Sequence, residues 1–231
     1  MKRITWLSAE HDATWFPPAE RALDEPAGLL AAGGDLSPAR LRAAYRLGIF
    51  PWYSPGQPVL WWCPDPRTVL FPKEFRRSKS LDKSERNRGF EITFDTDFES
   101  VVTACAAPRS SDSGTWITDE MSAAYLALHR LGDAHSVEIR RAGALVGGLY
   151  GVQLGRVFFG ESMFSSERDA SKVALSALCR RCLALGIVLI DCQLATAHLV
   201  SLGSRTIPRS EFLQLIASHA AAQIPNAWSG G

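Results

Sequence analysis

The stretch Ile187-Val188-Leu189-Ile190-Asp191-Cys192-Gln193 decides the fold of this chain. Its four consecutive large apolar residues predict a short strand that is buried on both faces of a sheet. Side chains alternate along a strand, so Asp191 and Gln193 are expected on one face and Cys192 on the other. A carboxylate and an amide would then lie at the C-terminal end of a buried strand, where open sheets bind ligands. A strand that simply ends in polar residues explains this stretch alone equally well.

The elements before this strand set its place in a sheet. Three strands are predicted over 136–140, 144–152 and 156–160, and the turn signals between them favour an antiparallel meander. A long helix is predicted to start at Asp169 and to stop at Gly186. The strand at 187–193 would then run parallel to the last strand of the meander. This order predicts an α+β fold, with a mixed sheet flanked by helices.

The first 62 residues differ in character from the rest. A helix is predicted from its cap Ser37 and from Pro38 at its first position, and it is followed by a segment rich in aromatic residues and proline. Trp61 and Trp62 are expected in the core, whereas Trp52 lies between a proline and a turn and is the better candidate for a ligand contact. We expect a small N-terminal domain over 1–62 and a catalytic domain over 63–231.

The length, charge and composition of the chain exclude several classes of protein. The chain has 231 residues and a formal charge of +1, so any contact with nucleic acid must come from a local patch. It shows no signal peptide and no apolar run of membrane-spanning length. Its five cysteines are odd in number and scattered, which predicts reduced thiols in a cytoplasmic protein. Cys179 and Cys182 form a CxxC without a second pair, so packing is expected rather than metal binding.

One segment, 73–88, is conspicuously basic. It holds seven lysines and arginines against three acidic residues, a local excess that suits a phosphate backbone. A solvated loop with scattered charges is the competing interpretation.

The order of elements resembles the acyltransferase fold of the GNAT N-acetyltransferases. Members of that fold hold the coenzyme A pyrophosphate in a glycine-containing loop at a helix N-terminus. The corresponding segment here, 165–172, contains Glu167 and Asp169 and no glycine. Because two carboxylates would repel a pyrophosphate, the sequence predicts a GNAT-like scaffold that excludes acetyl-CoA.

A set of short motifs resembles the leucyl/phenylalanyl-tRNA protein transferase family closely. The matching stretches include 33–37, 48–52, 61–67, 115–118, 134–138, 145–151, 160–165, 170–172, 190–193 and 198–203. They extend over roughly residues 16 to 213, and so many spaced matches make coincidence implausible. Cys63 departs from the family pattern, which commonly has serine there, and 76–87 shows little pattern beyond its basic character.

The resemblance implies a reaction. Leucine or phenylalanine, and less readily methionine, would move from aminoacyl-tRNA to the N-terminal arginine or lysine of an acceptor protein. The new peptide bond would create an N-degron. No metal and no coenzyme is implied, because the tRNA ester is already activated. We expect a cytoplasmic monomer whose partners are aminoacyl-tRNA and acceptor proteins, with no membrane.

The resemblance also implies roles for single residues. Asp191 and Gln193 would hold the acceptor α-amine as the catalytic pair. The family relay gives the amine proton to Gln193, but an amide oxygen is a very weak base, so we expect Asp191 to accept it, directly or through water, while Gln193 orients the amine. Glu161 would bind the acceptor, pairing with the basic side chain of its first residue.

The donor would be held by three further groups of residues. The leucyl or phenylalanyl side chain needs a dry slot, for which the candidates are Met163, Phe164, Ile190, Val146 and Leu178. Trp52 and Trp116 would stack on or flank the 3′-terminal adenosine. The tRNA phosphates are assigned to Arg76, Arg77, Lys79, Lys83 and Lys172, with Ser171 beside the last.

Two other functions compete with this interpretation. An acetyl-CoA-dependent GNAT N-acetyltransferase is favoured by the fold and opposed by the loop at 165–172. A non-catalytic tRNA-binding module could use the basic segment and the tryptophans, but it would have no need for Asp191 and Gln193.

Overall fold

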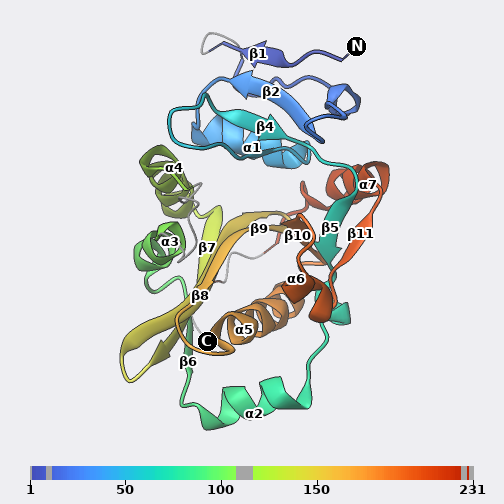
Figure 1. The fold of residues 1–231 in the computed structure, drawn as a ribbon. Helices are drawn as coiled ribbons and strands as arrows, with labels where there is room; N and C mark the ends of the chain where they lie inside the picture. The colour runs from blue at the N-terminus through green and yellow to red at the C-terminus, as the bar shows by residue number, and fades with distance from the viewer. Residues whose placement is uncertain (1, 9–11, 108–116, 225–227, 229–231) are drawn as a thin grey trace.

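The computed structural model describes residues 2–8, 12–107, 117–224 and 228. Their strands form two sheets, one above the other in the view of Figure 1. The smaller sheet has the strand order β1-β2-β4-β3. Its strands are β1 (Thr5–Leu7), β2 (Leu29–Gly33), β3 (Phe50–Pro51) and β4 (Leu60–Trp62).

The larger sheet carries the predicted meander. Its strand order is β11-β5-β10-β9-β8-β7-β6. The strands are β5 (Arg67–Leu70), β6 (Glu91–Phe94), β7 (Ala134–Arg141), β8 (Ala144–Leu154), β9 (Val157–Ser165), β10 (Leu189–Gln193) and β11 (Arg205–Ile207). β10 pairs parallel with β9, and the other neighbours pair antiparallel, so the sheet is mixed. The predicted α+β order of meander, helix and parallel strand is therefore confirmed.

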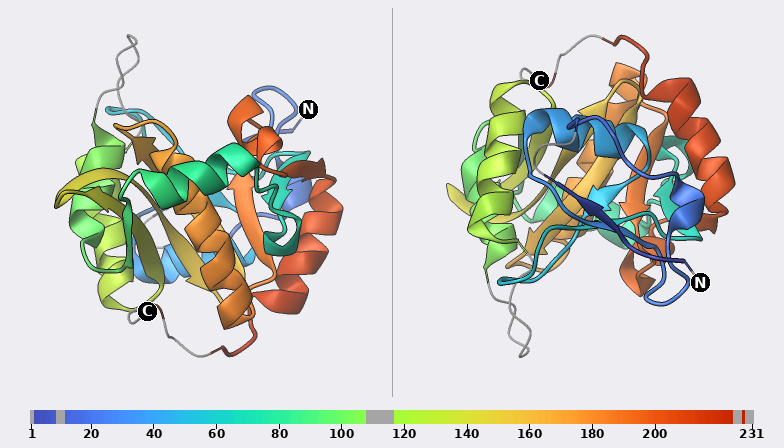
Figure 2. Two further views of the ribbon diagram at one scale, coloured as in Figure 1. Left: turned by 90° about the horizontal axis from the view of Figure 1, so that it is seen from below. Right: turned by 90° about the horizontal axis from the view of Figure 1, so that it is seen from above.

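Helices cover both faces of this sheet (Figures 1 and 2). They are α1 (Pro38–Arg46), α2 (Lys79–Asn87), α3 (Phe98–Ala106), α4 (Asp119–Arg130), α5 (Ala170–Leu185), α6 (Ala197–Ser201) and α7 (Arg209–His219), with short 3-10 helices at Ala19–Arg21 and Pro72–Glu74. The smaller sheet, α1, α3, α4 and α7 share one apolar core with one face of the larger sheet. α5, with α2 beside it, packs on the other face around a second core. Phe159 points into the first core and its neighbour Phe158 into the second, as alternation along β9 requires.

Local sequence signals set most of the helix ends. The Ser37 hydroxyl accepts the Arg40 N–H and the Thr118 hydroxyl accepts the Met121 N–H, which are N-cap contacts at α1 and α4. Gly186 ends α5 in the left-handed conformation, with φ 75°. The last long helix starts at Arg209, after Pro208.

The glycines of β8 allow close approach of the backbone. A Cβ on Gly147 would lie 2.6 Å from the Ala170 Cβ, so α5 could not sit as close to the strand. A Cβ on Gly151 would lie 2.2 Å from the Phe159 carbonyl oxygen, where the β8 and β9 register shifts. The glycines of β8 thus mark a close approach of the backbone and a bulge in its pairing with β9.

Three predicted elements need correction. The decisive strand starts at Leu189 rather than at Ile187, because Ile187 donates its N–H to the Cys182 carbonyl at the end of α5. The segment 161–165 lies inside β9 rather than after it, since it pairs with β8. The basic segment is a helix rather than a loop over 79–87, capped by the Ser78 hydroxyl.

None of the helices in the described ranges is both long and apolar enough to cross a bilayer.

Candidate active site

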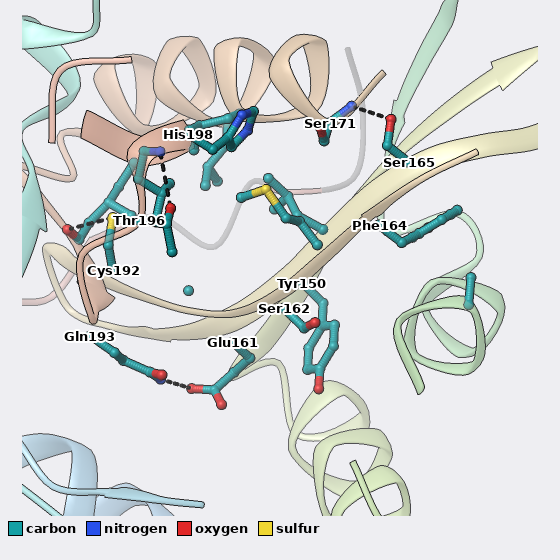
Figure 3. Close-up of a pocket in the computed structure, with 18 of the residues that line it drawn as sticks. Tyr150, Glu161, Ser162, Phe164, Ser165, Ser171, Cys192, Gln193, Thr196 and His198 are labelled. Carbon is teal, nitrogen blue, oxygen red and sulfur yellow. Dashed lines mark hydrogen bonds between the residues drawn. The ribbon is translucent and has the colours of Figure 1, made fainter. Parts of the chain in front are cut away.

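The site forms where two parallel strands separate. β9 and β10 pair only from Val157 with Leu189 to Phe159 with Asp191, while β9 continues along β8 to Ser165. A cavity of about 940 Å³ lies beyond that point, and α5 and α6 complete its wall (Figure 3). The end of the decisive strand is thus a ligand-sized opening rather than a plain polar terminus.

One part of the cavity wall is apolar. It is formed by Leu149, Phe158, Met163, Phe164, Leu175, Leu178 and Ile190. Four of these are predicted pocket residues, namely Met163, Phe164, Leu178 and Ile190. Val146, the fifth, is 6% exposed and packs in the core against α5 instead. Leu149, Phe158 and Leu175 were not predicted, because in the sequence they are ordinary core positions of a strand and a helix.

Asp191 is held by a buried arginine. Arg67 on β5 donates from Nε to Asp191 Oδ1 at 2.8 Å and from Nη2 to Oδ2 at 2.6 Å. The two side chains are 0% and 1% exposed, and the Gln193 N–H also donates to Asp191 Oδ1. Burial opposes the charge on Arg67, but Asp191 outweighs burial and raises the pKa of the guanidinium. Both oxygens of Asp191 are therefore engaged, and its charge is matched within the protein.

Arg67 is also held by two aromatic rings from distant elements. Its guanidinium carbon lies 4.7 Å from the ring centre of Phe50 and 4.6 Å from that of Phe212. Phe50 belongs to β3 of the smaller sheet and Phe212 to α7. Cation–π contacts of this kind stabilise a guanidinium that has no water around it. Arg67 thus ties the smaller sheet and the last helix to the site.

Gln193 departs from strand geometry. It has φ 61°, and the pairing of β10 with β5 shifts register between Asp191 and Gln193. The expected alternation therefore ends at Asp191, and it does not determine where Gln193 points. The Gln193 side chain reaches Glu161, with Nε2 3.3 Å from Oε1 (Figure 3).

Glu161 lies on β9 with its carboxylate among neutral donors. The hydroxyl of Tyr45 donates to Oε1 at 2.7 Å, and that of Tyr125 donates to Oε2 at 2.5 Å. Glu161 is 8% exposed and lines the cavity. Burial raises the pKa of Glu161 to about 7, although the two tyrosine hydroxyls favour the carboxylate.

The sequence analysis missed Arg67, Tyr45 and Tyr125. Arg67 closes the motif at 61–67, and its position at the start of a buried strand was a usable signal, since a buried arginine needs a partner. Tyr45 and Tyr125 are buried like the apolar residues around them in the sequence, and nothing local shows that their hydroxyls have a carboxylate partner.

Comparison with known proteins relates this site to a family. The family model for leucyl/phenylalanyl-tRNA protein transferase matches residues 69–217, and the model for the N-terminal domain of that transferase matches residues 34–65. The protein named leucyl/phenylalanyl-tRNA--protein transferase in Pseudomonas entomophila (strain L48) is 58% identical over 225 residues, which are 97% of this chain and 99% of that protein. The chain belongs to the leucyl/phenylalanyl-tRNA protein transferase family.

Other comparisons differ in strength. The protein of the same name in Chromohalobacter salexigens is 58% identical over 224 residues, covering 97% of this chain and 87% of that protein. Among solved structures, a GCN5-related N-acetyltransferase from Kribbella flavida is similar with a TM-score of 0.41 and 12% identity, over 74% of this chain and 61% of that chain. The structural likeness is remote and does not bear on what the site does.

Trp52, one of the two predicted RNA-stacking residues, does not line the cavity in this transferase family member. Trp52 is 42% exposed, and its carbonyl accepts the indole N–H of Trp62 at 2.6 Å. Trp61 is fully buried, as predicted, whereas Trp62 is only partly buried. Trp116 lies outside the described residues.

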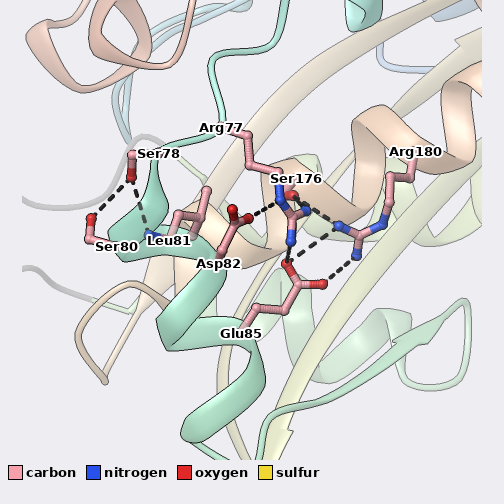
Figure 4. Close-up of polar contacts among 8 residues, drawn as sticks. All are labelled: Arg77, Ser78, Ser80, Leu81, Asp82, Glu85, Ser176 and Arg180. Atoms are coloured by element: carbon pink, nitrogen blue, oxygen red, sulfur yellow. Dashed lines mark hydrogen bonds and ion pairs between the residues drawn. The ribbon is translucent and has the colours of Figure 1, made fainter.

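The basic residues in α2 and just before it fall into two groups. Arg77 is bound by Asp82, by Glu85 at 2.8 Å and by the Ser176 hydroxyl at 2.9 Å, and Arg180 of α5 joins the same network (Figure 4). This network ties α2 to α5, so Arg77 is engaged within the protein. Lys79, Lys83 and Arg86 are exposed, and their spacing of four and three residues places them on one face of the helix. Arg76 is exposed just before the helix.

The loop at 165–172 is neutralised internally. Glu167 pairs with Arg141 at 2.6 Å. Asp169 accepts the Ser84 hydroxyl at 2.8 Å and pairs with Lys172 at 3.3 Å. The predicted phosphate contact Lys172 therefore already has a carboxylate partner, and Ser171 beside it lines the cavity.

All five cysteines are free thiols, and four of them are buried. Cys179 and Cys182 lie on the buried face of α5, in the second core. The described part of the chain brings together no group of three or more His, Cys, Asp or Glu side chains that could hold a metal ion.

Proposed function

We propose that this chain transfers leucine or phenylalanine, and less readily methionine, from aminoacyl-tRNA to the N-terminal arginine or lysine of acceptor proteins. The product is a peptide bond, and the new N-terminal residue acts as an N-degron. Membership of the transferase family and the printed names of its relatives support an aminoacyltransferase. The single observation that carries the proposal is a cavity in which an apolar wall and the polar group of Glu161, Asp191 and Gln193 meet at the end of β10.

The apolar wall suits the transferred residue. Leucine and phenylalanine are both apolar but differ in shape, and Met163 is a flexible side chain that adapts to either. Methionine is unbranched and loses more rotamer freedom than leucine when it is held in the same space, so we expect it to be used less readily.

The polar group suits the acceptor. Asp191 and Gln193 would orient the α-amine beside the ester carbonyl, since Arg67 and the bulge at Gln193 fix their positions. Much of the rate would come from holding amine and ester in a reactive geometry, which converts a bimolecular step into an intramolecular one. The ester is already activated, so no coenzyme is required.

Further residues would contact the donor tRNA. Trp52 and Trp116 would receive the 3′-terminal adenosine. The outer face of α2, with Lys79, Lys83 and Arg86, would receive tRNA phosphates, and Arg76 and Lys172 would add to it. In this arrangement residues 1–62 form an N-terminal domain that supplies Tyr45 and Phe50 to the site, and 63–231 form the catalytic domain.

We expect the chain to act as a monomer in the cytoplasm, where its donor would be found. One observation disfavours acetyl-CoA as the donor. The segment 165–172 has no glycine, and its carboxylates Glu167 and Asp169 already pair with Arg141 and Lys172, the nearby cations that a pyrophosphate would otherwise attract.

The transfer assay tests the proposed function. The protein is incubated with radiolabelled leucyl-tRNA and a peptide that begins with arginine or lysine, and label in the peptide is counted. The same peptides with an acetylated N-terminus serve as controls and should stay unlabelled. Label from acetyl-CoA in place of leucyl-tRNA, or no label from any aminoacyl-tRNA, would overturn the proposal.

A further inference from the structure

Two carboxylates face the site, and their surroundings differ. Asp191 accepts two hydrogen bonds from Arg67 and one from the Gln193 N–H, and its side chain is 1% exposed. Glu161 accepts hydrogen bonds from the neutral side chains of Tyr45, Tyr125 and Gln193. Asp191 therefore already has a positive partner, whereas no cationic side chain in the described part of the chain binds the Glu161 carboxylate directly. A cationic group that enters the cavity meets Glu161 as the carboxylate without a matched charge.

We infer that Glu161 takes the proton from the acceptor's α-ammonium group, and that Tyr45 and Tyr125 are positioning residues for its carboxylate. The inference rests on the proposed function, since it concerns the same reaction. It gives Glu161 a different task from pairing with the acceptor's basic side chain. It also makes the N-terminal domain part of the reacting centre, because Tyr45 comes from α1.

The proton affinity of Glu161 matches this task. Its pKa is raised to about 7 by burial, with Asp191 adding to the rise and Arg67 opposing it. An α-amine titrates at about 7.7 to 8.0, so its proton moves to such a carboxylate with little penalty. An ordinary glutamate titrates at about 4.3 and would be a far poorer acceptor for the same proton.

The tyrosines around Glu161 stay uncharged throughout the neutral pH range, so they do not alter the pKa of Glu161 as pH changes. Burial raises the pKa values of the hydroxyls of Tyr45, Tyr125 and Tyr150 well above their ordinary range, so all three stay protonated. The charged neighbours are Asp191 on β10 and Arg67 on β5, which form one ion pair. The three tyrosines therefore keep the same charge while Glu161 titrates.

The step balances as follows. The α-ammonium group gives one proton to the Glu161 carboxylate and becomes a neutral amine. The nitrogen lone pair then forms the new C–N bond at the ester carbonyl carbon. The electron pair of the breaking C–O bond leaves on the tRNA 3′ oxygen, which takes the second proton from the nitrogen. Glu161 returns its proton to water after the product departs.

Comparing wild type with Glu161→Gln across pH tests the assignment. Transfer to an arginine peptide is measured from about pH 6 to about pH 8.5, a range that spans the ordinary pKa of an α-amine. Without a proton acceptor, only the fraction of amine that is already neutral can react. We expect the kcat of Glu161→Gln to be lower by about tenfold to a hundredfold at pH 6.5, and the deficit to shrink towards pH 8.5. The acceptor KM should change little.

The pH at which kcat falls distinguishes a positioning role of the two tyrosines from a merely structural one, because loss of packing alone would not shift it. Tyr45→Phe and Tyr125→Phe each remove a donor to the carboxylate, so the pKa of Glu161 rises and the acid limb of the kcat profile should move up by about one pH unit. Tyr53→Phe is the matched control, because the Tyr53 hydroxyl bonds to Thr118 away from the cavity. Its profile should coincide with that of wild type. Circular dichroism of each variant confirms that it is folded.

The outcomes separate the inference from the proposed function. A deficit of Glu161→Gln that is constant with pH and expressed in the acceptor KM overturns the inference and supports pairing with the acceptor's side chain. If the acid limb of the kcat profile stays at the same pH in Tyr45→Phe and Tyr125→Phe, the positioning role of the two tyrosines is overturned. No transfer by wild-type protein at any pH overturns the proposed function itself.

Discussion

Replacing Arg67 by methionine should destabilise the protein severely, because it leaves the Asp191 carboxylate buried without its partner. The two side chains are 0% and 1% exposed, so water cannot take the place of the guanidinium. Breaking a buried ion pair from one side costs about 3 to 5 kcal/mol. Methionine restores part of the contact with the rings of Phe50 and Phe212, so the loss of cation–π contact adds little to that figure. A protein of this size has a total stability of about 5 to 15 kcal/mol, so the change is a large fraction of the whole.

A double-mutant cycle isolates the pair. Urea unfolding at pH 7, followed by circular dichroism, is measured for wild type, Arg67→Met, Asp191→Asn and the double variant. Each single change leaves one buried charge, whereas the double change leaves none. The double variant should therefore lose no more stability than either single variant, which corresponds to a coupling energy of about 3 kcal/mol.

Arg140→Met is the matched control. Arg140 pairs with Asp97, and their side chains are 26% and 32% exposed, so its removal should cost about 0 to 1 kcal/mol. Equal losses for Arg67→Met and Arg140→Met, or fully additive losses in the cycle, would refute the view that burial makes the Arg67 pair different.

Three further predictions concern pH, salt and specificity. Burial raises the pKa of Glu161 from 4.5 to about 7, so the stability that protonated Glu161 contributes is fully present below about pH 4.5 and is lost as pH rises through 7. Glu161→Gln should abolish about 2 to 3 kcal/mol of the fall in unfolding free energy between pH 5 and pH 8. Equal falls in the wild type and the variant would refute this prediction. Replacing Lys79, Lys83 and Arg86 together by alanine should reduce the slope of log binding constant against log salt concentration for leucyl-tRNA by about two to three units. Arg77→Ala should reduce that slope by less than one unit, because Arg77 is already paired. A larger reduction for Arg77→Ala than for the triple variant would place the phosphates on Arg77. Met163→Ala enlarges the apolar part of the cavity, so it should favour phenylalanine, the larger of the two transferred residues. The kcat/KM for phenylalanyl transfer, divided by that for leucyl transfer, should rise by about tenfold. An unchanged ratio would show that Met163 does not contact the transferred side chain.

Local sequence determined the elements and their order. The run from Leu189 to Ile190 is apolar on both faces, and it became a strand with β9 and β5 as neighbours. The caps Ser37 and Thr118 and the stop at Gly186 act through backbone groups within a few residues, so they could be recognised without knowledge of the fold. The family was also recognisable, since its motifs are short stretches that keep their spacing.

A pattern of charge does not show which basic residues have a partner in the folded chain. Arg77 lies in a basic segment and is assigned to phosphates by sequence, and in the structure Asp82 and Glu85 of the following helix α2 bind it while Arg180 ties α2 to α5. Lys172 likewise has Asp169 as its partner. The exposed face with Lys79 and Lys83 became visible only once the segment was known to be a helix, because a helical period sorts residues by face.

The tertiary structure alone decided the chemistry of the site. Arg67 and Asp191 are 124 residues apart, and the antiparallel pairing of β5 with β10 brings them together. Glu161 meets Tyr45 and Tyr125 only because α1 and α4 pack on the same face of the sheet. Sequence by itself determined that carboxylates and an amide would stand at the end of a buried strand. It could not determine which carboxylate receives a charged partner and which receives only neutral donors, because proton affinity depends on burial and on neighbours that arrive from distant parts of the chain.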